Sequence, residues 1–188
     1  MLTLCLVRHG EVENPEGIIY GRLPGFGLSR RGRGQIDAAA DKLAARAPFD
    51  ALYASPMQRA QESAEPLASR LGLPVRTEER IIETDIGSFQ GKRFEDLPKP
   101  YITEEKTHPE LEAASSMRRR LLSFAEGLFE SHPGGRVVAV SHRDPIIVAL
   151  LHWQGRPLDD LPGFDLDTGA AYEVVLLAPD RAQKTTPL

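Results

Sequence analysis

The stretch Leu4-Cys5-Leu6-Val7-Arg8-His9-Gly10 is a short apolar run that ends in an arginine, a histidine and a glycine. A second run near the other end of the chain, Val137-Val138-Ala139-Val140-Ser141-His142, also ends in a histidine. Short continuous apolar runs are typical of strands buried on both faces of a parallel sheet. Ligands of open α/β sheets bind just beyond the carboxyl ends of the strands. We therefore expect the two histidines to face one pocket.

Strands and helices alternate along the rest of the chain. The expected strands are residues 3–7, 51–54, 75–77, 136–140 and 171–177. The expected helices are residues 29–46, 55–71, 115–130 and 146–152, with Ser29, Ser55 followed by Pro56, and Ser115 or Ser116 as the N-caps of the first three. The polar segment 180–188 is expected to be frayed. This alternation predicts an α/β fold, a three-layer sandwich with a mostly parallel (mixed) central sheet and helices on both faces.

The length of 188 residues predicts a single α/β domain over residues 1–188. Its irregular part is residues 86–112, which contain several glycines and prolines. Long irregular segments inside compact domains are usually functional. We therefore expect an insertion at about 92–112 to lie near the active site.

Composition and charge limit the partners. The chain is 41% hydrophobic and 27% charged, and its formal net charge is −4, which argues against nucleic acid or anionic membrane as a general partner. Cys5 is the only cysteine and the apolar N-terminal run is too short for a signal peptide, so we expect a cytoplasmic protein without an internal disulfide. The sequence leaves the oligomeric state open.

The residues near the two histidines suit phosphate chemistry. A neutral imidazole can attack phosphorus and carry the phosphoryl group, which makes His9 a candidate nucleophile. Arg8 and Arg59 would hold phosphoryl oxygens through forked hydrogen bonds and would disfavour protonation of His9. His142 would donate a proton or stabilise charge on the phosphoryl oxygens. These residues predict a phosphate pocket that needs no metal and no other cofactor.

A leaving alkoxide also needs a proton donor. Glu83 lies between an apolar pair and a glycine-containing loop, where partial burial would raise the pKa of its carboxyl group. It could then act as general acid and afterwards as base for the attacking water. Asp85, two residues further on, is the alternative acid.

Five segments resemble the histidine phosphatase superfamily, in its phosphoglycerate mutase-like branch. They are LVRHGE at 6–11, LSRRGRGQ at 28–35, YASPMQRAQESA at 53–64, ETDIGSFQG at 83–91 and VSH at 140–142. The resemblance implies a mixed sheet with helices on both faces, a phosphohistidine at His9, a phosphate pocket of Arg8, Arg59 and His142, proton donation by Glu83, and no metal. The function it implies is a metal-independent phosphomonoester hydrolase acting on a small phosphorylated metabolite.

The sequence departs from the family pattern at three positions. Pro15 stands where the family often has a phosphate-contacting Asn, and Asn14 lies one residue earlier. Arg143 replaces the glycine that often follows the second histidine, and would either add a cation near the substrate or pair with Asp144 and point away. Phe89 replaces a frequent tryptophan.

The sequence does not name the substrate. We expect selectivity to come from the insertion and from the loop 17–26, with Gly21, Arg22, Asn14 and Arg143 as further substrate-binding candidates. Sugar phosphates, a nucleotide-derived phosphate, a cobalamin-precursor phosphate and a phosphoacid all remain open. Two alternatives to a phosphatase also remain, a phosphoglycerate mutase-type phosphotransfer enzyme and a non-catalytic phosphate-binding module.

Overall fold

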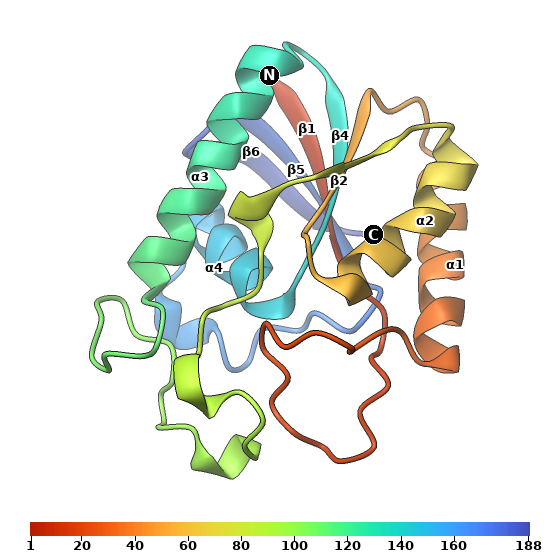
Figure 1. Cartoon of the computed structure of the whole chain (residues 1–188). Helices are drawn as coiled ribbons and strands as arrows, with labels where there is room; N and C mark the ends of the chain where they lie inside the picture. Colours follow the sequence, from red (N-terminus) through yellow and green to blue (C-terminus); the bar gives the residue numbers. More distant parts are fainter.

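The computed structural model describes all 188 residues and contains one six-stranded sheet in the order β3-β2-β4-β1-β5-β6 (Figure 1). The strands are β1 (Leu2–Arg8), β2 (Ala51–Ala54), β3 (Val75–Thr77), β4 (Arg136–Ser141), β5 (Ala171–Ala178) and β6 (Arg181–Pro187). Strands β3, β2, β4 and β1 pair in parallel, whereas β5 pairs antiparallel with both β1 and β6. The expected mixed, mostly parallel sheet is confirmed.

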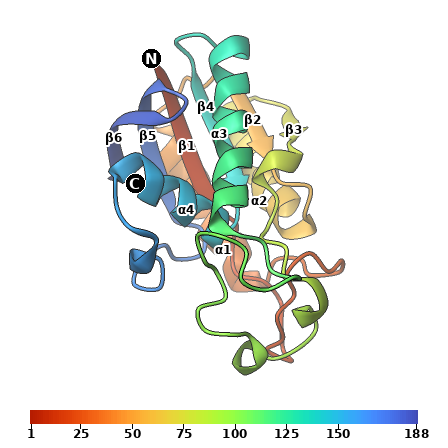
Figure 2. The same ribbon diagram turned by 90° about the vertical axis from the view of Figure 1, so that its left-hand side faces the viewer.

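Helices cover both faces of this sheet, as the sequence predicts. They are α1 (Arg30–Ala44), α2 (Gln58–Leu71), α3 (Ala114–Ser131) and α4 (Arg143–Gln154). Helices α1 and α2 pack on one face, and α3 and α4 pack on the other (Figures 1 and 2). Short 3-10 helices span Glu79–Ile81, Gly87–Phe89, Phe94–Asp96 and Leu158–Asp160. None of the helices combines the length and the apolar character that crossing a membrane requires.

The alternating side chains of β1 explain why its apolar run is continuous. Leu4 and Leu6 point into the core under α3 and α4, whereas Cys5 and Val7 point into the core under α1 and α2. A strand with helices on both faces must be apolar at every position. The same reasoning applies to α4, whose residues from Pro145 to Leu151 are all buried.

The start of three helices differs from the sequence prediction. Helix α2 has Met57 rather than Ser55 as its N-cap, and α3 has Ala113, so Ser115 and Ser116 lie inside its first turn. Helix α4 begins at Arg143, three residues earlier than expected, because a proline such as Pro145 is tolerated in the first turn of a helix. Ser29 caps α1 as predicted, accepting a hydrogen bond from the backbone of Gly32.

The polar C-terminal segment is not frayed. It forms β6, which pairs antiparallel with β5 along the edge of the sheet. An edge strand needs only one buried face and often carries lysine and proline, which discourage pairing with other chains. The polarity of this segment does not prevent order, because its order comes from pairing with β5.

The irregular segment 86–112 packs on a small core of its own. Ile19, Ile86, Leu97 and Leu111 are buried together, and this cluster joins the segment to the loop after β1. Both loops lie at the carboxyl ends of the parallel strands (Figures 1 and 2). The fold therefore brings the two least regular parts of the chain to the edge where ligands bind in sheets of this kind.

Candidate active site

The carboxyl ends of three neighbouring strands position the site. Strands β1 and β4 pair in parallel with Arg8 opposite Ser141, and the backbone N–H of His9 donates to the Ser141 carbonyl at 3.0 Å. The N–H of Ser55, directly after β2, donates to the Val140 carbonyl at 2.9 Å. The sheet ladder thus extends by one residue past each strand and places His9, His142 and Ser55 side by side.

His9 is held in one tautomer. Its Nδ1 lies 2.8 Å from the Gly10 carbonyl oxygen, which can only accept a hydrogen bond. The Nε of Arg59, which can only donate, lies 3.3 Å from Nε2. The proton is therefore on Nδ1 and the lone pair on Nε2. Burial first, and then the charges of Arg59 and Arg8, lower the pKa of His9 well below its usual value. A neutral, oriented imidazole results.

Two arginines in this region have buried N–H groups without a hydrogen-bond partner. Arg59 is fully buried, and its Nη2 donates to the Gly21 carbonyl at 2.8 Å and contacts Glu83 Oε2 at 3.3 Å. Its Nη1 has no partner, and neither has Nε of Arg8, whose Nη1 donates to the Leu166 carbonyl at 2.7 Å. Buried donors are almost always satisfied in native proteins. Buried donors without a partner on two arginine side chains indicate a site for an anion.

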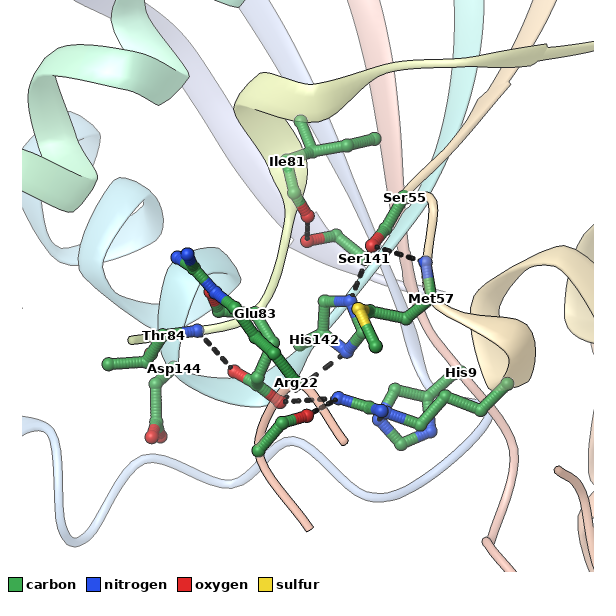
Figure 3. A network of polar contacts seen from close by, with 12 residues as sticks. His9, Arg22, Ser55, Met57, Ile81, Glu83, Thr84, Ser141, His142 and Asp144 are labelled. Carbon is green, nitrogen blue, oxygen red and sulfur yellow. Dashed lines mark hydrogen bonds and ion pairs between the residues drawn. The ribbon is translucent and has the colours of Figure 1, made fainter. Parts of the chain in front are cut away.

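His142 connects Ser55 to Glu83 (Figure 3). Its Nε2 lies 2.7 Å from Ser55 Oγ, and its Nδ1 lies 3.4 Å from Glu83 Oε2. The Ser55 hydroxyl otherwise only accepts, from the backbone N–H of Met57 at 3.4 Å, so its proton points to His142 Nε2. His142 therefore carries its proton on Nδ1, which is buried and faces Glu83. Burial, followed by the charge of Arg59, lowers the pKa of His142 well below its usual value.

The contact between Ser55 and His142 makes a prediction about the imidazole itself. Replacing Ser55 with alanine removes the only donor to Nε2, so we expect His142 to become a mixture of tautomers. Nitrogen-15 chemical shifts of the histidine ring will detect this change. Ser141→Ala is the matched control, because Ser141 is equally buried but donates to the Ile81 carbonyl at 2.7 Å instead. An unchanged His142 spectrum in Ser55→Ala would contradict the assignment.

Glu83 lies where a proton donor is needed. Its Oε1 accepts a hydrogen bond from the backbone N–H of Thr84 at 2.9 Å, and Oε2 contacts Arg59 and His142. Burial, and then the negative charge of Asp144, raises the pKa of Glu83 above its ordinary value, although Arg59 opposes this. Asp85, the alternative acid, is half exposed and pairs with Arg22 at 3.6 Å. The geometry favours Glu83.

The same side chains also have the spacing of metal ligands. One nitrogen from each of His9 and His142 and one carboxylate oxygen of Glu83 lie within 4.8 Å of one another. The Arg59 guanidinium contacts two of these three side chains. Its Nε lies 3.3 Å from His9 Nε2, and its Nη2 lies 3.3 Å from Glu83 Oε2. A divalent cation held by these three ligands would therefore lie against a buried positive charge. The electrostatics favour an anion over a metal ion.

A cavity of about 130 Å³ opens beside these residues. Arg8, Glu83 and Arg143 border it, together with Tyr20 and Gly21 from the loop after β1. Tyr20 stacks on Arg59, with the guanidinium carbon 4.7 Å from the ring centre. His9, Arg59 and His142 are buried behind this lining rather than in it. Because His9 is almost fully buried, a phosphoryl group can reach it only if side chains around it move.

The remaining predicted binding residues differ in their positions. Asn14 does not line the cavity. Its side-chain amide donates a hydrogen bond to the Ile18 carbonyl and accepts one from the Ile18 N–H. Arg22 supports Glu83 by donating to its carbonyl at 2.8 Å and does not line the cavity. Arg143 was expected either to add a cation near the substrate or to pair with Asp144. It borders the cavity and also pairs with Asp144 at 3.0 Å.

Sequence reasoning missed two contributors. Ser55 was interpreted as a helix cap, although it directly follows a strand just as His9 does, which is a signal that it faces the same pocket. Tyr20 lies in a loop without a recognisable pattern, and its contact with Arg59 depends on tertiary structure alone.

The chain is similar in sequence to known proteins. A family model described as "Histidine phosphatase superfamily (branch 1)" matches residues 4–185. Phosphoserine phosphatase 1 of Hydrogenobacter thermophilus is 34% identical over 185 residues, covering 93% of this chain and 86% of its own length. Uncharacterized protein Rv0525 of Mycobacterium tuberculosis is 39% identical over 166 residues, which cover 81% of this chain and 79% of that protein.

Solved structures share the fold. YhfR of Bacillus stearothermophilus superposes with a TM-score of 0.84 at 22% identity, covering 97% of this chain and 95% of that one. A phosphoserine phosphatase of Entamoeba histolytica in complex with 3-phosphoglyceric acid gives a TM-score of 0.81 at 23% identity, covering 99% and 97%.

Proposed function

The chain belongs to branch 1 of the histidine phosphatase superfamily, and on that premise we propose that it hydrolyses phosphomonoesters through a phosphohistidine at His9. The observation that carries this proposal is the state of His9. Its Nε2 lone pair is held beside Arg59, while Nδ1 is fixed on Gly10 and a low pKa keeps the ring neutral. A neutral imidazole oriented in this way supports the role of nucleophile.

In the first step, His9 Nε2 attacks phosphorus in line with the leaving oxygen. A bond forms between nitrogen and phosphorus, and the bond between phosphorus and the ester oxygen breaks. Glu83, whose pKa is raised by burial, gives a proton to the leaving oxygen, and the alcohol departs. The ring left on His9 is a phosphoimidazolium, whose Nδ1–H remains bonded to the Gly10 carbonyl.

In the second step, water attacks the phosphoryl group on the side that the alcohol has left. The Glu83 carboxylate takes a proton from this water, the bond between phosphorus and Nε2 breaks, and inorganic phosphate leaves. His9 and protonated Glu83 are thereby regenerated, so the cycle needs no further reactant.

The positive groups stabilise the transferred phosphoryl group in both steps. Arg59 Nη1 and Arg8 Nε supply donors that otherwise have no partner, and His142 Nδ1 supplies a third. His142 is also the N-cap of α4, whose positive end favours an anion there. Transfer through a loose transition state depends mainly on such positioning and charge.

Several relatives support phosphatase activity. Phosphoserine phosphatase 1 is a relative in sequence, and the structural neighbours include a glucosyl-3-phosphoglycerate phosphatase and a phosphoserine phosphatase. We therefore favour hydrolysis of a small phosphorylated metabolite over a mutase reaction. We also propose that no metal takes part, because Arg59 supplies the positive charge that a metal would bring.

A hydrolysis screen tests this proposal. Purified protein treated with EDTA is expected to release phosphate from at least one member of a panel of phosphoserine, 3-phosphoglycerate, sugar phosphates and 4-nitrophenyl phosphate. Added Mg²⁺, Mn²⁺ or Zn²⁺ should bring no gain. Loss of activity with EDTA that a divalent ion restores would overturn the metal-independent mechanism. No phosphate release, with interconversion of phosphoglycerates instead, would replace the phosphatase by the mutase.

A further inference from the structure

A second, larger hollow adjoins the cavity at the candidate active site. Its volume is about 900 Å³, against about 130 Å³ for the cavity beside Glu83. Phe94, Leu97 and Tyr101 line both, so the two lie on either side of these side chains. We call the larger hollow the side groove. The segment 94–104 of the insertion forms one wall, and residues 158–162 form the other.

The walls of the side groove are largely apolar. Besides the three shared residues, Ile102, Leu158 and Leu161 line it. Phe94 has an exposed fraction of 59% and is one of only three large apolar residues that are exposed in the whole chain. Together with these walls, Phe94 forms a concave and mainly apolar surface of the kind that binds small ligands.

The partition between the cavity and the side groove is fixed to the active site. The hydroxyl of Tyr101 donates to Asp144 in the first turn of α4 at 2.7 Å, two residues after His142. Glu83, the proposed proton donor, lies across the same cavity. A phosphoester with its phosphorus near His9 and its ester oxygen near Glu83 would therefore direct its alcohol past Phe94 into the side groove.

The charges in the side groove disfavour an acidic alcohol. Glu95, Glu104 and Asp159 line it, against the single cation Lys99. Glu104 is paired with Arg118 from α3, which leaves two carboxylates against one ammonium group. A carboxylate on the substrate would find no unopposed cation in the groove.

Resting on the proposed function, we propose that the substrate's alcohol is uncharged and mainly apolar, of aromatic or alicyclic size, and that the side groove binds it. This substrate class differs from phosphoserine and phosphoglycerate, whose alcohols carry carboxylates. The phosphoryl group supplies the charge that Arg8 and Arg59 recognise, and the apolar part supplies the surface that Phe94 and its neighbours cover.

A pair of substrates isolates the contribution of the groove. Ethyl phosphate and 2-phenylethyl phosphate both release simple alkyl alcohols and differ by one phenyl ring. We expect kcat/KM of the wild-type protein to be roughly tenfold or more higher for the phenylethyl ester, as a buried apolar ring contributes. Phe94→Ala should reduce this ratio severalfold. Leu177→Ala, which removes another exposed apolar side chain on the distant strand β5, should leave both rates unchanged.

Binding of the matching phosphonates, measured by calorimetry, tests the groove without turnover. Ethylphosphonate and 2-phenylethylphosphonate should show the same preference and the same loss in Phe94→Ala. Equal affinities in the wild-type protein, or a preference that Phe94→Ala leaves intact, would overturn the groove assignment. If neither ester is hydrolysed while the phosphonates still bind with this preference, the proposed catalysis fails and the groove assignment stands.

Discussion

Replacing His9 with alanine is expected to lower kcat for phosphomonoester hydrolysis by roughly 10⁴-fold or more. His9 Nε2 is the atom that would form the bond to phosphorus, because its lone pair accepts only the long 3.3 Å contact from Arg59 Nε. Nε2 of His142 is occupied by the Ser55 hydroxyl and Nδ1 carries a proton. Initial rates on the best substrate from the screen, in protein purified away from host phosphatases, will measure the effect.

Two further variants make this result specific. His142→Ala should cost about 10²- to 10³-fold, because it removes a stabilising donor rather than the nucleophile. His152→Ala should leave the rate unchanged, since His152 lies in the last turn of α4, at the end remote from the site. Wild-type rates in His9→Ala would refute the mechanism, and equal losses in all three variants would point to impaired folding instead.

Replacing Glu83 with glutamine is expected to lower kcat on alkyl phosphates by about 10²- to 10⁴-fold, as the loss of a general acid does. The effect should depend on the leaving group. 4-Nitrophenolate needs no proton to depart, so the first step on 4-nitrophenyl phosphate should survive in this variant. The second step still lacks its base, so a rapid burst of nitrophenol should precede a slow steady state. A uniform loss on both ester types, without a burst, would contradict this role.

The pH dependence of kcat/KM follows from the same two groups. The reaction needs neutral His9, whose pKa is lowered, so the rate should fall on the acid side only well below pH 6.5. It also needs protonated Glu83, whose pKa is raised, so the rate should fall as pH rises through that pKa. Glu83→Gln should abolish the alkaline fall. Persistence of this fall in the variant would assign it to the substrate or to another group.

The apolar runs predict the buried strands of the sheet. Residues 51–54 form β2 with the expected bounds, because a strand buried between helices leaves a continuous apolar pattern. Residues 75–77 form β3 with the expected bounds although this strand is not buried. The start of α2 is harder to predict from the sequence, because no side chain caps this helix. Strand β6 could not be predicted, because its order comes from pairing with β5 rather than from its own composition.

The candidate site was predictable to the extent that it depends on strand ends. His9 and His142 each follow a strand, and the order of strands β1 and β4 makes them neighbours. The sequence does not predict the tertiary contacts that fix the tautomer of a histidine or shape a groove. The tautomer of His142 depends on Ser55, 87 positions away, and the side groove depends on how the insertion folds against residues 158–162.

The most direct test of the phosphohistidine is to trap it. Glu83→Gln mixed with 4-nitrophenyl phosphate and quenched in alkali within the burst should carry about one phosphoryl group per chain, because formation outruns hydrolysis. Peptide mass spectrometry should place that group on His9 and find none in Glu83→Gln combined with His9→Ala. A phosphoryl group on any other residue, or a burst of nitrophenol from protein whose His9 stays unmodified, would contradict the account.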